Sequence, residues 1–169
     1  MEEFGTQVVP HIPRLRRYAR ALTGERTAAD DLVQDTLERA CNKLHLWRRG
    51  SDLRAWLFTI MHNVFINQVR GRRVVPDVPL NDEIMELPAH SAQADRLEIR
   101  DLDAALARLP DEQREVLLLV ALEQLSYEET AKALGIPIGT VMSRLSRARE
   151  RLRAIMAGLP GVATLKVVK

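Results

Sequence analysis

Five arginines and a single glutamate occur between residues 138 and 157, in the last part of the sequence. A guanidinium group is permanently charged and presents a planar fork of donors, so it pairs with phosphate oxygens or with the O6 and N7 edge of guanine. The chemistry favoured by this cluster is therefore nucleic-acid binding. A solvated helix face can also be rich in arginine, so charge alone does not decide between the two interpretations.

The residues before and within this cluster predict a helix-turn-helix. Ser126 and Glu129 have the spacing of a capping box, and Gly135 suits the position just after a helix. We expect a short helix over residues 126–134 and a second helix over residues 139–157. The second helix would enter a major groove, because its width matches that groove and its first turns reach base edges.

The second predicted helix has two sides. One side carries an apolar stripe that should pack on the preceding helices: Val141, Leu145, Ala148, Leu152 and Ile155. The other side is polar and basic, and its N-terminal amides can meet a phosphate. The residues expected to contact DNA are Thr140, Met142, Ser143, Arg144, Ser146, Arg147 and Arg149.

A helix predicted over residues 53–70 carries aromatic, amide and arginine side chains outside its apolar stripe. Aromatic rings can stack on unpaired bases, an amide can read base edges, and arginine can contact phosphate. Ordinary core packing explains Trp47 and Trp56 equally well. The residues expected at such a single-strand contact are Trp47, Arg48, Arg54, Trp56, Asn63, Asn67, Arg70, Arg72 and Arg73.

Acidic and amide side chains share one side of a helix that should begin near Thr27. Asp31, Gln34, Asp35 and Glu38 lie on adjacent turns and would meet a basic partner, with Leu32 as an apolar anchor. Taken alone, this pattern is better explained as a solvated acidic face.

Charge and proline divide the chain into segments. Residues 1–73 hold 13 Lys/Arg against 8 Asp/Glu, whereas residues 74–95 hold five acids, no basic residue and three prolines. We predict an all-α protein with helical domains over residues 1–73 and 95–157, an acidic linker over residues 74–94 and a tail over residues 158–169. No apolar run is long enough to span a bilayer, and residues 1–10 do not resemble a signal peptide, so a soluble cytoplasmic protein without membrane insertion is expected.

Enzyme and metal chemistry find little support. The sequence contains no Gly-rich phosphate loop, no nucleophile elbow and no paired catalytic carboxylates, so no catalytic residue and no cofactor are expected. Cys41 and His45 stand four apart on a predicted helix, but a metal site needs three or four converging ligands. The single cysteine also excludes a disulfide within the chain.

The helix-turn-helix residues carry a specific resemblance. Leu125 to Arg149, and above all the run Gly-Thr-Val-x-Ser-Arg-Leu-x-Arg-Ala-Arg from Gly139, resemble the −35-binding region of the extracytoplasmic-function (ECF) group of sigma-70 family factors. The Leu-Pro-x-x-x-Arg run that ends at Arg114 resembles the start of that domain. The resemblance implies that Met142, Ser143, Ser146 and Arg147 face the −35 element.

The first half resembles the same family. Residues 30–40 are similar to the segment that docks on the polymerase β′ subunit, and residues 56–63 to the segment that captures flipped bases of the −10 element. The resemblance adds Phe58 and Ile60 to the −10 contact, puts Asn63 at the base-reading position, and gives Trp47 a place in the pocket wall. It also implies a linker that threads toward the active centre of the polymerase.

The function implied is that of an alternative sigma factor that binds core RNA polymerase through β′ and β, recognises and melts promoter DNA, and is controlled by an anti-sigma factor. The run from Leu53 to Arg70 further resembles the branch tied to general stress responses. The rival interpretations are a helix-turn-helix regulator of the response-regulator type without sigma activity of its own, and a metal sensor.

Overall fold

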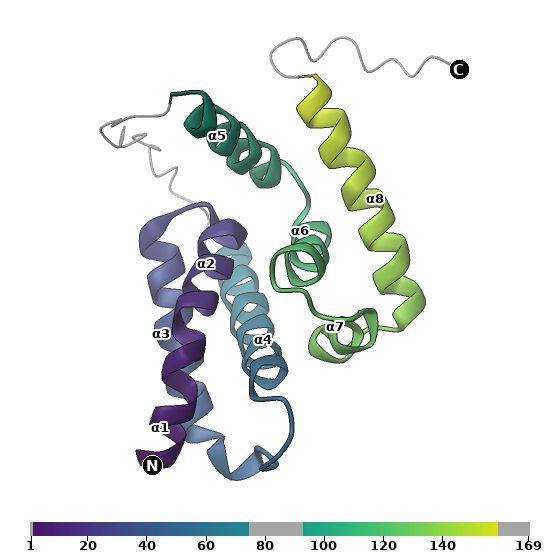
Figure 1. Ribbon diagram of the computed structural model, residues 1–169. Coiled ribbons are helices and arrows are strands. Elements are labelled where there is room, and N and C mark those ends of the chain that lie inside the picture. Colours follow the sequence, from purple (N-terminus) through teal and green to yellow (C-terminus); the bar gives the residue numbers. More distant parts are fainter. Residues whose placement is uncertain (1, 75–92, 159–169) are drawn as a thin grey trace.

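The computed structural model describes residues 2–74 and 93–158, and within these ranges it contains helices and no strand, as predicted. Side chains are described for residues 2–71 and 100–158. The elements are α1 (Glu2–Val8), η1 (Val9–His11), α2 (Ile12–Thr23), α3 (Arg26–Asn42), η2 (Leu44–Leu46), α4 (Leu53–Val74), α5 (Gln93–Ala107), α6 (Asp111–Leu117), η3 (Leu118–Leu122), α7 (Tyr127–Leu134) and α8 (Ile138–Ala157). Figure 1 shows two helical bodies, α1 to α4 and α5 to α8. The predicted linker and tail fall almost entirely outside the described residues.

Local signals place the helix ends of the first body. Gly24 adopts a positive φ of 72° and ends α2, a conformation that glycine takes without a steric penalty. Asp52 starts α4, because its Oδ1 accepts a hydrogen bond from the Ala55 amide at 3.3 Å. The helix expected to begin near Thr27 is α3, which begins at Arg26 after the extended residue Glu25, so Thr27 is not its cap.

The core of the first body lies where α2, α3 and α4 meet. Leu15, Leu32 and Leu57 are at most 1 % exposed. Tyr18 and Phe58 pack edge to face in this core, with ring centroids 5.1 Å apart. This packing fixes which side of α4 points outward.

The second body contains the predicted helix-turn-helix. Ser126 Oγ accepts from the Glu129 amide at 3.0 Å, and Glu129 Oε2 accepts from the Ser126 amide at 3.2 Å, so the capping box is present. Gly135 ends α7 with a φ of 64°, and Pro137 stands at the N-cap of α8. From Asp111 the chain is α-helical to Leu117 and then widens to the π-helical η3.

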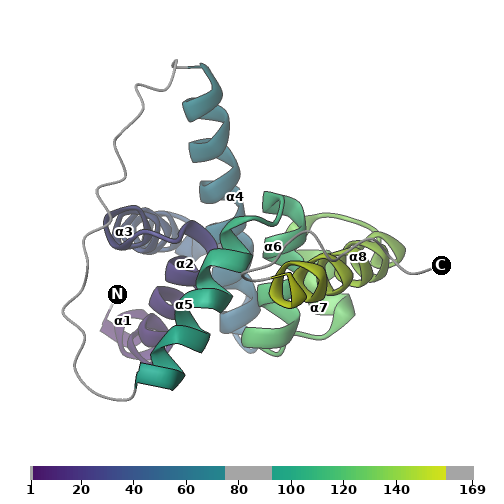
Figure 2. The same ribbon diagram turned by 90° about the horizontal axis from the view of Figure 1, so that it is seen from above.

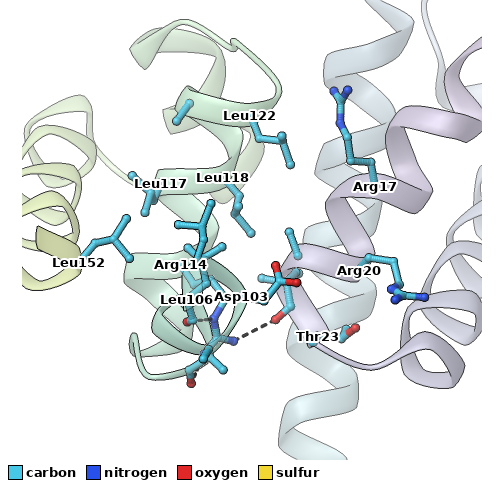
Figure 3. A pocket seen from close by; sticks show the side chains of 17 residues that line it. Arg17, Arg20, Thr23, Asp103, Leu106, Arg114, Leu117, Leu118, Leu122 and Leu152 are labelled. Carbon is cyan, nitrogen blue, oxygen red and sulfur yellow. Dashed lines mark hydrogen bonds between the residues drawn. The ribbon is translucent and has the colours of Figure 1, made fainter. Parts of the chain in front are cut away.

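Arg114 joins the two bodies. The residue is only 9 % exposed, and its guanidinium group donates to backbone oxygens at the ends of two helices. These acceptors are Leu106 O at 2.7 Å, Leu109 O at 2.6 Å, Ala107 O at 3.1 Å and, in the first body, Leu22 O at 2.9 Å. Figure 3 shows the bonds to Leu106, Ala107 and Leu22 beside a groove of about 890 Å³ between α2 and the second body. The side chain therefore satisfies carbonyls that the helices leave open.

The two bodies also pack through α4 against α7 and through α2 against α5 and η3. In Figures 1 and 2, α8 runs along the side of the second body that faces away from α1 to α4. Among the described residues, no helix is long and apolar enough to cross a membrane.

Candidate nucleic-acid interface

The predicted DNA face of α8 is open to solvent. Val141, Leu145 and Ala148 are at most 2 % exposed, so this stripe fixes the rotation of the helix against α6 and α7. The exposed residues on the remaining surface include the predicted contacts Met142, Ser143, Ser146, Arg147 and Arg149, whereas Thr140 and Arg144 are half-buried. Most of the predicted set thus shares one accessible side of the helix.

The arginines of this face differ in their surroundings. Arg144 lies against α6, with its Nη2 3.8 Å from Glu112 Oε2. Arg147 is exposed and makes no hydrogen bond or ion pair with the residues whose side chains are described. An arginine without a protein partner keeps its donors for a guanine edge or a phosphate, so Arg147 has the better geometry for direct contact.

On α4, three of the predicted single-strand contacts are open to solvent. Asn63, Asn67 and Arg70 are exposed there. Arg48, which lies in the segment before α4, is also exposed. The side chains of Arg72 and Arg73 lie outside the described part of the structure.

Trp47 and Trp56 belong to an aromatic cluster with Phe4. The ring centroids of the two tryptophans lie 6.4 Å apart, and each lies 6.3 Å from Phe4. Both tryptophans are half-buried, so the core interpretation explains part of each ring. The indole N–H of Trp47 has no acceptor among the described residues, although the atom is buried.

Two residues of the predicted −10 contact are in the wrong place for it. Phe58 is 1 % exposed and Ile60 is 5 % exposed, and both belong to the hydrophobic core. Phe58 is held against Tyr18, and Ile60 falls on the core stripe of α4. Neither side chain can stack on a base in this arrangement, so the prediction of direct DNA contact is wrong for both.

Arg54 contacts the second body. Its Nη1 donates to the backbone oxygen of Glu123 at 3.2 Å, and its Nη2 lies 3.8 Å from Glu129 Oε2. The Glu123 carboxylate is fully buried and pairs with Arg17 at 3.2 Å. Arg54, predicted as a DNA contact, thus takes part in the packing between the bodies.

A second acid completes this packing. His62 Nδ1 lies 2.5 Å from Glu115 Oε2, and Glu115 is only 2 % exposed. Burial raises the pKa of Glu115, and the hydrogen bond with His62 opposes that rise. Sequence reasoning missed both buried glutamates; the available signal was an acid at each end of a long aliphatic run, Glu115 directly before it and Glu123 directly after it.

The predicted polymerase-docking face on α3 is largely exposed. Asp31, Gln34 and Glu38 point to solvent, and Asp35 is exposed but accepts a hydrogen bond from Gln68 at 2.9 Å. Leu32 is 0 % exposed and lies in the core, so its prediction as a surface anchor is wrong. The physical reason is that the apolar side of α3 packs on α2 and α4.

Cys41 is an exposed free thiol, and His45 is exposed as well. In the described ranges, no three His, Cys, Asp or Glu side chains are arranged so that they could hold a metal ion.

Two family models match the chain. Residues 8–62 match the sigma2 domain of PhyR, and residues 99–152 match sigma-70 region 4. The second match spans the helix-turn-helix, and the first spans most of the helices of the first body.

Relatives match over nearly the whole chain. The ECF RNA polymerase sigma factor EcfG of Rhodopseudomonas palustris is 40 % identical over 88 % of this chain and 82 % of its own length. The sigma factor SigE of Mycolicibacterium smegmatis is 34 % identical over 93 % of this chain and 63 % of its own length. The sigma factor RpoE of Bartonella quintana, solved with the anti-sigma factor NepR, has a TM-score of 0.78 and 39 % identity over 93 % of this chain and 98 % of its own. With both helical bodies matched in the same order, the chain belongs to the ECF group of sigma-70 family RNA polymerase sigma factors.

Proposed function

We propose that this protein is an alternative sigma factor that guides core RNA polymerase to a set of promoters and melts them. The observation that carries the proposal is the 40 % identity to EcfG over most of both chains, which covers the two helical bodies together. We propose that the protein acts in the cytoplasm, together with the polymerase.

The second body would bind the −35 element as duplex DNA. Its helix α8 presents an exposed side with Ser143, Ser146 and Arg147, and the buried stripe holds that side in a fixed orientation. Arginine pairs with the guanine edge and serine bonds to several bases, so this side has the chemistry for base reading. The remaining arginines add attraction to phosphate that weakens as salt rises.

The first body would capture bases of the −10 element after they leave the stack. The exposed Asn63 supplies an amide for a base edge, Trp56 offers part of a ring, and Arg70 supplies charge for phosphate. Unstacking a base costs a few kcal/mol, and a site that binds the extruded base returns part of that cost. This chain makes and breaks no covalent bond in such a step.

The packing between the bodies must open on a promoter. The two elements are about 25 base pairs apart, which is roughly 85 Å of duplex, whereas a folded chain of this length is only about 40 Å across. The contacts of Arg54 with Glu123 and of His62 with Glu115 would then break. The packed arrangement is thus a form of the free protein or of an inhibited complex.

An anti-sigma factor is the proposed inhibitory partner, and core polymerase is the proposed activating one. The anti-sigma partner is supported by the similarity to RpoE of Bartonella quintana, whose structure contains NepR. Core polymerase as a partner is supported by the exposed acidic side of α3, which carries Asp31, Gln34 and Glu38. The negative charge of this side would attract a basic polymerase surface.

A second candidate function has its own support. The first family match is to the sigma2 domain of PhyR, and PhyRSL from Sphingomonas sp. Fr1, solved in complex with NepR, is 26 % identical over 92 % of this chain. A sigma-like decoy would bind an anti-sigma factor without starting transcription.

Run-off transcription tests the proposal. Purified protein is combined with core polymerase on a library of promoter fragments, and the RNA ends are sequenced. A sigma factor gives transcripts that start at a defined subset of promoters. A decoy, or a regulator without sigma activity, gives none above core polymerase alone.

Replacing Asn63 with alanine should impair promoter melting. Loss of the amide removes base-edge hydrogen bonds worth about 1 kcal/mol, so the open-complex yield on a limiting promoter should fall about fivefold. The fraction of unpaired thymines, measured by permanganate reactivity, is the readout. Asn42→Ala, an exposed asparagine at the end of α3, is the matched control. Normal melting by Asn63→Ala would remove this residue from the capture site.

Replacing Asp35 with arginine should weaken binding to core polymerase. The change puts like charges together at a basic partner surface, which should cost about 1–2 kcal/mol, or roughly tenfold in Kd. Fluorescence anisotropy of labelled protein titrated with core polymerase measures this. Asp101→Arg changes the net charge equally on an exposed site of α5 and should bind normally. If the two variants bind alike, the acidic face of α3 is not the docking surface.

A further inference from the structure

Two apolar side chains are exposed at the N-terminal end of α8. Ile138 is 41 % exposed and Met142 is 49 % exposed, and they stand one helical turn apart. Both lie beside the buried stripe, on the edge of the helix that also carries Arg149 and Arg153. An exposed methionine is normal by itself, and the significance of Met142 comes from its position on α8.

That position is where a groove-bound helix reaches base edges. The first turns of such a helix approach the bases, and the later turns lie nearer the backbone. Met142 begins the second turn of α8, next to Ser143 and one turn before Ser146, both of which are exposed. Its unbranched thioether is flexible enough to adapt to the edge that it meets.

The neighbouring polar groups favour other kinds of contact. Ser143 Oγ donates to the Thr140 backbone oxygen at 3.2 Å, so its lone pairs remain available to accept a hydrogen bond. Arg147 provides only donors. Met142 offers no donor and only a weakly accepting sulfur, so its exposed surface gains free energy mainly by contact with another apolar group.

A major groove presents one apolar group, the C5 methyl of thymine. We infer that Met142, supported by Ile138, contacts a thymine methyl in the −35 element and makes this protein prefer thymine at one position. The inference rests on the proposed function, since it assigns a base preference to the same helix. If the inference is right, the preference for thymine comes from contact with its methyl group and not from a hydrogen bond to the base.

Deoxyuridine gives a direct test, because it differs from thymidine only by the missing methyl group. The protein assembled with core polymerase is bound to promoter fragments found by run-off transcription, and each −35 thymine is replaced in turn by deoxyuridine. One replacement should weaken binding by the wild type about threefold to fivefold. Met142→Ala should bind the thymine promoter more weakly by a similar factor and should be indifferent to that replacement.

Met156→Ala is the matched control. Met156 is also exposed, at 37 %, but it lies about 21 Å further along the same helix, beyond the base-reading turns. This variant should keep both wild-type affinity and the full penalty for deoxyuridine. Both methionines are exposed, so neither change should disturb folding, which circular dichroism can verify.

The outcomes separate the inference from the proposed function. If specific promoter binding persists but no thymine methyl matters, or if Met142→Ala keeps the full deoxyuridine penalty, the inference is wrong and the sigma function stands. If no promoter is bound in preference to random DNA, the function fails and the inference fails with it.

Discussion

Replacing Arg114 with alanine is expected to lower the free energy of unfolding by about 3–5 kcal/mol. The guanidinium group is buried and donates to four backbone oxygens, three after the end of α5 or in its last turn and one at the end of α2. Alanine would leave these carbonyls buried without donors. It would also remove one bond that joins the two bodies.

Urea denaturation followed by far-ultraviolet circular dichroism measures this loss. Both tryptophans, Trp47 and Trp56, lie in the first body, so their fluorescence shows whether that body shares the destabilisation. Arg108→Ala, an exposed arginine six residues earlier, should stay within about 0.5 kcal/mol of the wild type. Arg114→Lys should lose an intermediate amount of stability, more than Arg108→Ala and less than Arg114→Ala, because an ammonium group cannot reproduce the planar fork of the guanidinium group. A loss below about 1 kcal/mol for Arg114→Ala would contradict the role of this network.

Replacing Arg147 with alanine should weaken binding to the −35 element by about 1–3 kcal/mol, roughly fivefold to 150-fold. Arg147 is exposed on the groove side of α8 and is engaged by no described side chain, so its donors are available to a base. The loss should be accompanied by relaxed preference at one base pair, because the other bases are read by other residues.

Holoenzyme binding to a set of single-base variants of the −35 element, at fixed salt, measures both effects. Arg151→Ala is the control, an exposed arginine on a later turn of the same helix. It should weaken all sequences alike and lower the salt dependence by about one phosphate contact. If Arg147→Ala behaves in the same uniform way, Arg147 contacts phosphate and does not read a base.

Local signals predicted the elements that position the −35 face. The capping box of Ser126 and Glu129 and the turn at Gly135 depend on residues only three to nine positions apart, so they can be identified in a sequence. The resemblance named Arg114 as part of a motif without a physical role. The structure supplies that role, a buried cap for two helices.

The errors at Phe58 and Ile60 share one cause. The resemblance assigned a function to a run of consecutive residues, but a helix exposes only part of each turn. A run such as 56–63 therefore must include core residues, and Phe58 and Ile60 are among them. On α3, Leu32 was expected as an anchor from the acidic pattern around it, but its side chain lies on the apolar side of the helix, in the core.

The packing between the bodies could not be predicted from local pattern. Glu115 and Glu123 meet partners on other helices, 53 residues away at His62 and 106 residues away at Arg17. No periodicity encodes such pairs. The only sequence trace is a charged residue next to a stretch of aliphatic side chains, which suggests an acid that must be buried with a partner.

Permanganate reactivity combined with nuclease protection, on one promoter fragment bound by this protein and core polymerase, shows whether the two bodies act on two separate elements. We expect two separate footprints: a protected duplex segment at the −35 element, and unpaired reactive thymines at the −10 element about 25 base pairs downstream. Protection without any reactive thymine, or no difference from core polymerase alone, would contradict this expectation.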